Sequence, residues 1–465
     1  MSLRRLNPFA SLPNPREVWA WGMYDLANQS FQLLINTLLF GIYLAEYVAP
    51  EPTPSGTTRG EAAWAVMIGA SLILVVLASP ILGAIADARS LRKEFLVVTG
   101  LGAVVLTAAL AAVGPGMLWL AAVLYIAAAF LVGIGENFLA SFLPQLATPA
   151  TMGRVSAIGW TMSYVGALLL LGLTAIAVFS LGATEPQQWR WIFVAAAVWF
   201  LVGMIPTVLF VHETIPPAPN GDTRAAGSLL TVGFRRLGAT IREARRYRQL
   251  MRFLAVFFVY SMGTMSVVFY AGIIGKRLGF GIGQLTLLAL VMALSAGAGS
   301  VLAARYQDRL GHRRTVRLYL TVWVLSTLAL AITEMRQSGA PANGAPMTFW
   351  LISAGIGLGL GGIGTASRAL VGCFTPATKS AEFFGLWGMV YKLAGVAGPL
   401  AFSVVTAFIG ATTGLFLLSA FFGAGLVLMA LIDEREGIAR AAQADSITPS
   451  AQPPHEPAAA GAPPR

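Results

Sequence analysis

Four charged side chains lie inside long apolar stretches of the sequence: Asp25, Glu136, Arg368 and Lys392. A lone charge near the centre of a bilayer costs roughly 2.5–3.5 kcal/mol on insertion scales, so the four should face protein or water and meet one another. Two acids and two bases could bind a zwitterionic solute, the acids taking an ammonium and the bases a carboxylate. They could instead close a gate across the molecule, or only stabilise helix packing. The sequence leaves these three interpretations open.

Polar residues accompany Asp25 on its stretch. Gln29, Gln32 and Asn36 follow it at the spacing i+4, i+7 and i+11, and Asn28 lies beside this stripe. Residues at this spacing share one helix face, and in lipid a polar face must look inward. The matching stretch of the second half offers Tyr260, Thr264 and further polar residues.

Proton coupling is a further hypothesis for Asp25 or Glu136. Burial raises a carboxyl pKa and neighbouring cations lower it, and the sequence does not decide between the two effects. We expect no other cofactor and no metal, because the three histidines are scattered and Cys373 is the only cysteine.

The composition places these residues in a membrane protein. Of the 465 residues, 57% are hydrophobic and 11% are charged, against about 25% charged in soluble domains. A helix that spans a bilayer needs about 20 mostly apolar residues. Twelve such runs are predicted, at 19–48, 62–86, 95–113, 117–143, 155–181, 191–211, 251–274, 281–304, 318–335, 347–374, 383–409 and 412–432.

The distribution of basic residues predicts the orientation of these spans. With the N-terminus inside, 24 of the 31 Lys and Arg residues fall in segments that face the cytoplasm and five in segments that face outward. This positive-inside bias places both termini in the cytoplasm. It also accounts for the net charge of +11 without a nucleic-acid partner. Counted from this side, the four charged residues lie roughly 9–14 Å deep, in one layer.

The longest cytoplasmic loop divides the chain into two halves of six spans. We expect a cytoplasmic N-terminal segment at 1–18 and a six-helix bundle at 19–211. A cytoplasmic linker at 212–250 should contain a basic amphipathic helix, lying on the anionic leaflet. A second six-helix bundle follows at 251–432, and the segment 433–465 should be disordered, because its end is rich in Ala and Pro.

The two halves repeat one another. One set of residues recurs at an offset of 227: Thr-Pro-Ala-Thr at 148–151, Trp160 and Tyr164 match Thr-Pro-Ala-Thr at 375–378, Trp387 and Tyr391. Another recurs at an offset of 221: Asp87, Arg92 and Lys93 match Asp308, Arg313 and Arg314. Duplicated halves around a midplane site are typical of secondary transporters. We therefore include Tyr164 and Tyr391 among the candidate site residues.

The second set also resembles a known signature. Gly83-x-x-x-Asp87 and Asp308-Arg309-x-Gly311-x-Arg313-Arg314 resemble the cytoplasmic loop motif of the major facilitator superfamily. An acid beside a helix end, with cations next to it, can latch one conformation and release it in another. The alternative is an ordinary positive-inside loop with incidental acids. Seven residues are thus candidate gating groups: Asp87, Arg92, Lys93, Asp308, Arg309, Arg313 and Arg314.

Motifs elsewhere narrow the resemblance to one family. Trp21-x-x-Tyr24-Asp25-x-Ala27-Asn28-x-Ser30-Phe31 opens the first span, and Gly153-Arg154-x-Ser156-x-x-Gly159 opens the fifth. Ser367-Arg368 and Glu382-Phe383-Phe384-Gly385, followed by Lys392 and Gly398-Pro399, mark the tenth and eleventh. Together, from about residue 17 to 432, these resemble the vacuole effluxer (autophagy-related) family and its bacterial relatives. The resemblance implies export of small molecules, and amino-acid efflux is associated with the fungal members.

One further motif has a structural explanation. Gly357-x-Gly359-x-x-Gly362 matches a dinucleotide fingerprint, but no strand precedes it and it lies in a predicted span. Close packing of helices through small residues explains it better.

These observations predict an all-α membrane protein with twelve transmembrane helices in two pseudo-symmetric six-helix bundles, the major facilitator fold. The predicted function is secondary active transport by alternating access, exporting a small polar or zwitterionic solute such as an amino acid. The alternatives are a drug or lysolipid exporter of this fold and a non-transporting receptor or scaffold. An enzyme is not expected, because the spans contain no histidine and Cys373 has no adjacent base. We expect a monomer in the bacterial plasma (inner) membrane, whose partners are the lipid bilayer and a small-molecule substrate.

Overall fold

The computed structural model describes residues 12, 14–53, 57–89, 91–147, 152–213, 242, 245–337, 347–376 and 380–447. The regular structure of these residues is helical, apart from one isolated bridge between Pro52 and Thr58. Within the described ranges, twelve helices are long and apolar enough to cross a membrane, which confirms the predicted number of spans.

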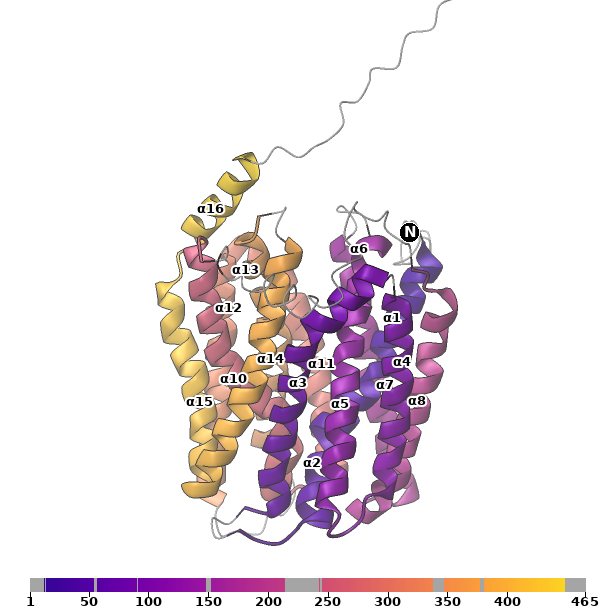
Figure 1. Ribbon diagram of the computed structural model, residues 1–465. Coiled ribbons are helices and arrows are strands. Elements are labelled where there is room, and N and C mark those ends of the chain that lie inside the picture. The colour runs from indigo at the N-terminus through magenta and orange to yellow at the C-terminus, as the bar shows by residue number, and fades with distance from the viewer. Residues whose placement is uncertain are drawn as a thin grey trace, which may run out of the picture.

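The first six spans form a group that we call the N-lobe, and the last six form the C-lobe (Figure 1). The N-lobe comprises α1 (Pro15–Gln29), η2 (Ser30–Leu39), α2 (Phe40–Tyr43), η3 (Leu44–Val48), α3 (Arg59–Arg89), α4 (Arg92–Ala109), η4 (Leu110–Ala112), α5 (Leu118–Ser141), α6 (Leu143–Leu146), α7 (Met152–Leu181), η5 (Pro186–Trp189) and α8 (Arg190–Phe210). The C-lobe comprises α10 (Arg248–Arg277), α11 (Ile282–Leu310), α12 (His312–Gln337), α13 (Met347–Cys373), α14 (Ser380–Phe408), α15 (Ala411–Leu428), η7 (Met429–Leu431) and α16 (Glu434–Ile447).

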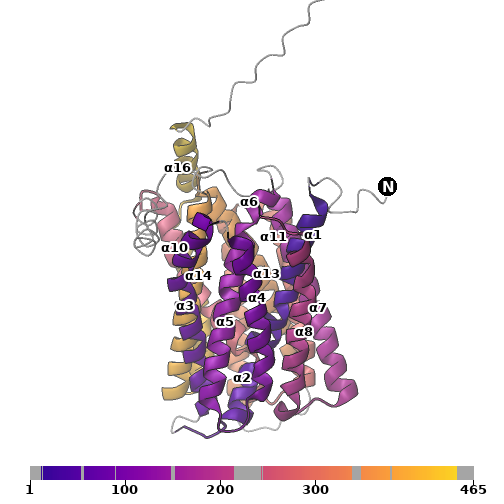
Figure 2. The ribbon, with the colours of Figure 1, turned by 45° about the vertical axis from the view of Figure 1, so that its right-hand side comes forward.

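Helix packing repeats from one lobe to the other. In the N-lobe α1 packs against α7 and α8, and in the C-lobe α10 packs in the same way against α14 and α15. The pairs of α5 with α3 and α4 likewise match those of α13 with α11 and α12. Between the lobes α3 packs against α14 and α7 against α11, again as a symmetric pair (Figures 1 and 2).

The glycines of α13 allow the closest of these approaches. A Cβ atom on Gly357 or Gly361 would collide with the backbone carbonyl of Met292 or Ala296 on α11, and one on Gly362 would collide with the Tyr319 ring on α12. This confirms that the dinucleotide-like motif is a helix-packing surface.

The first span is a continuous helix from Pro15 to Val48, but two parts of it are π-helical. Ser30–Leu39 is the longer part, and at its end the backbone N–H of Phe40 donates to the carbonyl of Ile35, five residues earlier. Such segments are rare and frequently occur at functional sites. This one carries much of the predicted polar stripe.

The C-terminal segment departs from the prediction of a disordered tail at 433–465. Residues Glu434–Ile447 form α16, because this stretch is rich in good helix formers and docks on the C-lobe. The Gln249 side chain donates from Nε2 to Glu436 Oε2 at 2.5 Å and accepts from the backbone N–H of Asp433 at 3.0 Å. Residues 448–465 and most of the predicted linker helix lie outside the described residues.

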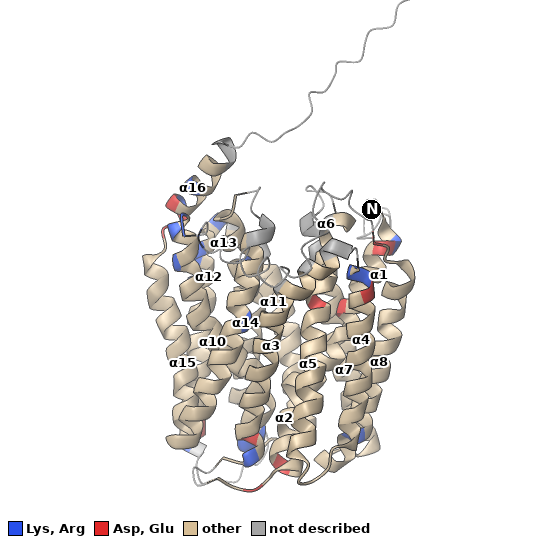
Figure 3. Ribbon diagram, in the orientation of Figure 1, with Lys and Arg blue, Asp and Glu red and all other residues tan. Residues whose placement is uncertain are grey.

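Charged residues gather at the two ends of the bundle (Figure 3). One end carries the start of α1 and α16, and we call it the predicted cytoplasmic end. The other carries the end of η3 and the start of α3, and we call it the outer end. The lobes are joined differently at these two ends, as described below.

Candidate functional site

Glu136 on α5 is held by two amide side chains of the first span. Its Oε1 accepts from Asn28 Nδ2 at 2.6 Å and from Gln32 Nε2 at 2.7 Å. These two hydrogen bonds fix the position of the Glu136 side chain against the first span.

The hydrogen bonds continue along the first span toward the outer end. Asn36 Nδ2 donates to Gln32 Oε1 at 2.7 Å, and the Tyr125 hydroxyl donates to Asn36 Oδ1 at 3.0 Å. Asn28, Gln32 and Asn36 are spaced four residues apart, so they lie in one row along the first span. The α-helical spacing had predicted Gln29 in this row. Gln29 is the last residue of α1, and among the described residues its side chain makes no hydrogen bond.

Asp25 lies against α7. Its Oδ2 would be 2.6 Å from a Cβ atom at Gly159, so only glycine fits at that position. Asp25 lies within electrostatic range of Glu136 and of Arg368, the latter from the opposite lobe. The structure thus brings together three of the four charged residues that the sequence singled out.

Arg368 on α13 lies between two tryptophan rings. Its guanidinium carbon is 5.0 Å from the ring centre of Trp160 and 5.7 Å from that of Trp387. Trp160 belongs to α7 in the N-lobe and Trp387 to α14 in the C-lobe, so the arginine bridges the lobes through cation–π contacts. Sequence reasoning treated these tryptophans only as markers of the repeat.

The remaining predicted site residues are three tyrosines near Arg368 and its aromatic neighbours, and one threonine. Tyr391 packs with Phe257 and Trp387 next to Arg368, and Tyr164 packs with Trp160. Tyr260 is buried, and its hydroxyl shares a 2.7 Å hydrogen bond with Ser367 Oγ, beside Arg368. By contrast, the Thr264 hydroxyl donates at 3.4 Å to the carbonyl of Tyr260 within its own helix.

Lys392 lies on α14 and is half-buried. Within the described ranges it makes no ion pair, and its place in a common layer with the other three charges stays a prediction. The described residues also contain no group of three His, Cys, Asp or Glu side chains that could hold a metal ion.

Among the described residues, two ion pairs join the lobes at the outer end, and sequence reasoning missed them. Lys276 Nζ lies 3.2 Å from Glu46 Oε2. Arg277 contacts Glu61 through both nitrogen–oxygen pairs, with Nε donating to Oε1 at 3.1 Å. The signal was available, because Glu61, Lys276 and Arg277 are among the few charges in the predicted outer segments and Glu46 lies two residues from the outer end of the first predicted span.

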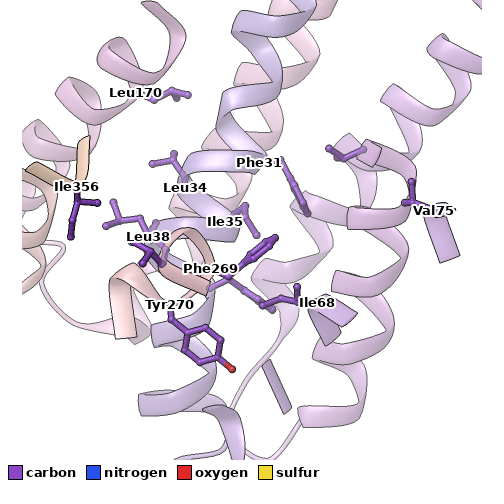
Figure 4. Close-up of a cluster of buried hydrophobic side chains, with 14 of the residues drawn as sticks. Phe31, Leu34, Ile35, Leu38, Ile68, Val75, Leu170, Phe269, Tyr270 and Ile356 are labelled. Atoms are coloured by element: carbon purple, nitrogen blue, oxygen red, sulfur yellow. The ribbon is translucent and has the colours of Figure 1, made fainter. Parts of the chain in front are cut away.

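Other contacts reinforce this closure. The Trp64 indole N–H on α3 donates to the backbone carbonyl of Phe269 on α10 at 2.9 Å. Figure 4 shows buried apolar side chains of both lobes in one cluster, among them Leu38 of η2, Leu170 of α7 and Ile356 of α13. Ion pairs and apolar packing together hold the lobes against each other on the outer side of the charged site.

At the predicted cytoplasmic end, two glutamates among the described residues make contacts within their own lobe. Glu213 accepts from the backbone N–H of Lys93 at 3.0 Å. Glu434 accepts from the backbone N–H groups of His312 and Arg313 at 2.9 and 3.0 Å. Each glutamate follows the last span of its lobe and caps the third span. The two are 221 residues apart, the offset of the loop repeat, a match that the sequence analysis overlooked.

The predicted gating residues are placed as follows. Arg313 donates from Nε to the carbonyl of Met429 at 3.1 Å and from a terminal nitrogen to that of Ala430 at 3.2 Å, both in the C-lobe. Arg309 and Arg314 are exposed, and Arg92 lines a 130 Å³ cavity between α3 and α5. The side chains of Asp87 and Asp308 lie outside the described residues. A latch between lobes through these loops therefore stays a prediction.

Two six-helix lobes with repeated packing, and a charged site between them, define a transporter of the major facilitator superfamily. Solved structures of this superfamily match the fold. A D-xylose–proton symporter aligns with a TM-score of 0.65 at 13% identity, over 91% of this chain and 97% of that one. The nucleoside transporter NupG aligns with a TM-score of 0.64 at 13% identity, over 90% and 98%.

The chain belongs to the family described as vacuole effluxer Atg22 like, whose model matches residues 53–442. The MFS-type transporter YxiO of Bacillus subtilis, described as uncharacterized, is 25% identical over 425 residues, 89% of this chain and 94% of that protein. Autophagy-related protein 22 of Coccidioides immitis is 25% identical over 285 residues, 59% of this chain and 43% of that protein. The family is one of transporters and not of enzymes.

Proposed function

We propose that this chain exports a small zwitterionic solute, an amino acid, by alternating access. The observation that carries the proposal is the meeting of opposite charges from the two lobes. Asp25 and Glu136 come from the N-lobe, Arg368 comes from the C-lobe, and Asp25 and Arg368 interact across the interface. A solute with one ammonium and one carboxylate complements this arrangement.

The first and fourth spans, both of the N-lobe, would bind the ammonium. Glu136 Oε1 is already occupied by two amide donors, which fixes the position of its charge. The Oδ1 atom of Asn28 is buried and has no hydrogen-bond partner, so it is a free acceptor beside the two acids. Buried polar atoms are normally paired, and a ligand that donates hydrogen bonds would satisfy this one.

The contacts at the two ends support the alternation of access. The outer end is closed by ion pairs and apolar packing, whereas Glu213 and Glu434, among the described residues of the predicted cytoplasmic end, make contacts within their own lobe. This arrangement fits a state that receives substrate from the cytoplasm. Release would require the outer contacts to break while the lobes approach at the other end.

The membrane and topology follow from the same proposal. The bacterial relative YxiO and the excess of Lys and Arg on one side support a plasma-membrane protein with both termini in the cytoplasm. We propose that the monomer is the working unit, because each monomer contains both lobes and the site between them.

Counterflow in proteoliposomes tests the function. Vesicles preloaded with one unlabelled amino acid should accumulate the same labelled amino acid, while xylose, a nucleoside and a lysolipid should not exchange. Asp25→Asn and Glu136→Gln should abolish exchange, and Glu51→Gln, at an exposed acid of the outer end, should not. Exchange of the lysolipid alone, or of none of these solutes, would contradict the proposal.

A further inference from the structure

A chain of hydrogen bonds connects the charged site with the outer side of the N-lobe. The Tyr125 hydroxyl of α5 donates to Asn36 Oδ1 at 3.0 Å, and Asn36 Nδ2 donates to Gln32 Oε1 at 2.7 Å. Gln32 Nε2 then donates to Glu136 Oε1 at 2.7 Å. Every donor points toward the carboxylate, so the bonds polarise and strengthen one another. A change at Glu136 therefore acts on the far end of the chain, at Tyr125.

This far end packs against a residue that holds the C-lobe. The Tyr125 ring centre is 4.7 Å from that of Trp64 and 5.4 Å from that of Phe40. Trp64 is fully buried, and its indole N–H donates to the carbonyl of Phe269 on α10 at 2.9 Å, which is a hydrogen bond between the lobes. Phe269 also belongs to the apolar cluster that Figure 4 shows. Tyr125 thus helps to fix the ring that supplies the donor.

The first span touches the C-lobe directly at this level. A Cβ atom on Gly272 of α10 would lie 2.6 Å from the carbonyl oxygen of Leu38, which follows Asn36 by two residues. A Cβ atom on Gly41 would lie 3.2 Å from Ile273 Cδ1, also of α10. Close-packed interfaces of this kind separate as a unit and do not deform gradually. A shift of Asn36 would therefore disturb the closure of the outer end.

A ligand ammonium at Glu136 would compete for the oxygen that anchors the chain. Glu136 Oε1 accepts from both Asn28 and Gln32. A charged donor forms a stronger hydrogen bond with a carboxylate than a neutral amide does. Displacement of the Gln32 donor would release Asn36 and then Tyr125. The outer closure would lose this support when a substrate is bound, as export from the cytoplasm requires.

We propose that Tyr125 and Asn36 are positioning residues that link the occupancy of Glu136 to the closure of the outer end. The chain holds Trp64 against the C-lobe while the site is empty, and a bound ammonium removes this support. The effect of the ligand rests on the proposed function, whereas the link in the ligand-free protein does not. No sequence motif indicated Tyr125.

The first test measures the outer end of the full-length protein without ligand. Spin labels replace Glu51 and Met347, both exposed at this end, in a Cys373→Ser background. Tyr125→Phe keeps the ring and removes the donor. The population with an open outer end should rise about 2- to 10-fold, the usual effect of one lost hydrogen bond.

Tyr43→Phe is the matched control for this test. Tyr43 is buried in the same aromatic cluster, but its hydroxyl donates to the carbonyl of Val113 at 2.6 Å, within the N-lobe and outside the chain. Equal open populations in Tyr125→Phe and Tyr43→Phe would overturn the proposal. Asn36→Leu removes both hydrogen bonds in the middle of the chain and should open the outer end to a similar extent, so the test survives if Tyr125→Phe does not fold.

A double variant distinguishes a linked chain from independent packing. Gln32→Ala cuts the chain beside Glu136, so it should also open the outer end. Gln32→Ala combined with Tyr125→Phe should open it no further than the larger single effect, because groups that act as a unit are not additive. Additive effects would show two separate structural roles and overturn the link.

The ligand arm separates this proposal from the proposed function. A mixture of neutral amino acids should raise the open population of the wild type, and Tyr125→Phe should reduce this response. The variant should still gain melting temperature from the mixture, because the ligand binds its native state. A response like that of the wild type, or a loss of the thermal gain, would overturn the positioning role. If the mixture neither stabilises nor opens the wild type, the proposed function fails, and the ligand-free comparison still decides the link.

Discussion

The two ends of the bundle use their charges in opposite ways. At the outer end, Glu46 and Glu61 of the N-lobe pair with Lys276 and Arg277 of the C-lobe. At the predicted cytoplasmic end, Glu213 and Glu434 cap helices of their own lobes. Charges that cross the interface must separate when that end opens, whereas charges inside a lobe move with it. We therefore expect the outer ion pairs to break during transport and the caps at the other end to remain intact.

The outer pairs also differ from each other. The Glu61 side chain is 10% exposed and its contact with Arg277 is bidentate, whereas the Glu46 side chain is 38% exposed. A hydrogen bond to a charged group contributes about 1.5–3 kcal/mol. An exposed ion pair contributes about 0–1 kcal/mol. We therefore expect Glu61 and Arg277 to dominate the free energy that keeps this end closed.

The largest effect is expected at the site between the two ends. Asp25→Asn and Glu136→Gln should each reduce counterflow by on the order of 100-fold, because removing one partner of a desolvated charge pair costs about 2–5 kcal/mol. Both variants should keep the melting temperature of the wild type in detergent within a few degrees. Wild-type flux in both variants would show that neither acid is needed for transport.

The same site can be tested as a gate. If Asp25, Glu136 and Arg368 close the predicted cytoplasmic end, Glu136→Lys combined with Arg368→Glu should restore more counterflow than either substitution alone. If they bind substrate, the double variant should stay inactive, because the site then presents the wrong charge to each end of the solute. Recovery of flux would therefore replace the binding interpretation by a gate.

The second largest effect concerns the outer pairs. Glu61→Arg should shift the lobes apart at the outer end, because it replaces an attraction of about 1.5–3 kcal/mol with a repulsion from Arg277. Spin labels at Glu51 and Met347, both exposed at this end, would report the separation in a Cys373→Ser background. Adding Arg277→Glu should restore the short distance, and Glu46→Gln should change it less. An unaltered distance in Glu61→Arg would mean that the apolar cluster alone closes this end.

The fold and the site were predictable from the sequence to different extents. Long apolar runs and the duplicated motifs determine the twelve spans and the two lobes, because the bilayer leaves few alternatives to a helix. Asp25, Glu136 and Arg368 stand out because a charge in a span is costly. The hydrogen bonds of Asn28 and Gln32 to Glu136 could not be derived, since they depend on how the first and fourth spans pack. The aromatic stacking on Arg368 depends on how the lobes pack, which local patterns do not encode.

A smaller effect is expected for the caps of the predicted cytoplasmic end. Glu434→Gln should lower the free energy of unfolding by about 0.5–2 kcal/mol, the usual loss when a helix cap is removed. It should leave the distance between labels at Glu94 and Arg309, both exposed at this end, unchanged. Glu213→Gln should behave alike in the N-lobe. A change in the inter-lobe distance would show that these caps also take part in gating.

The smallest effect separates two neighbours on the first span. Gln32→Ala removes one of the two donors to Glu136 and leaves Asn36 without its acceptor, so counterflow should fall by roughly 10-fold, in line with about 1–3 kcal/mol for an unsatisfied buried group. Gln29→Ala removes a side chain without a hydrogen bond in the described residues and should change flux by less than about threefold. The polar stripe read from the sequence would predict similar losses for both, because it contains both residues. Equal losses would therefore contradict the assignment of Gln32, and not Gln29, as a donor to Glu136.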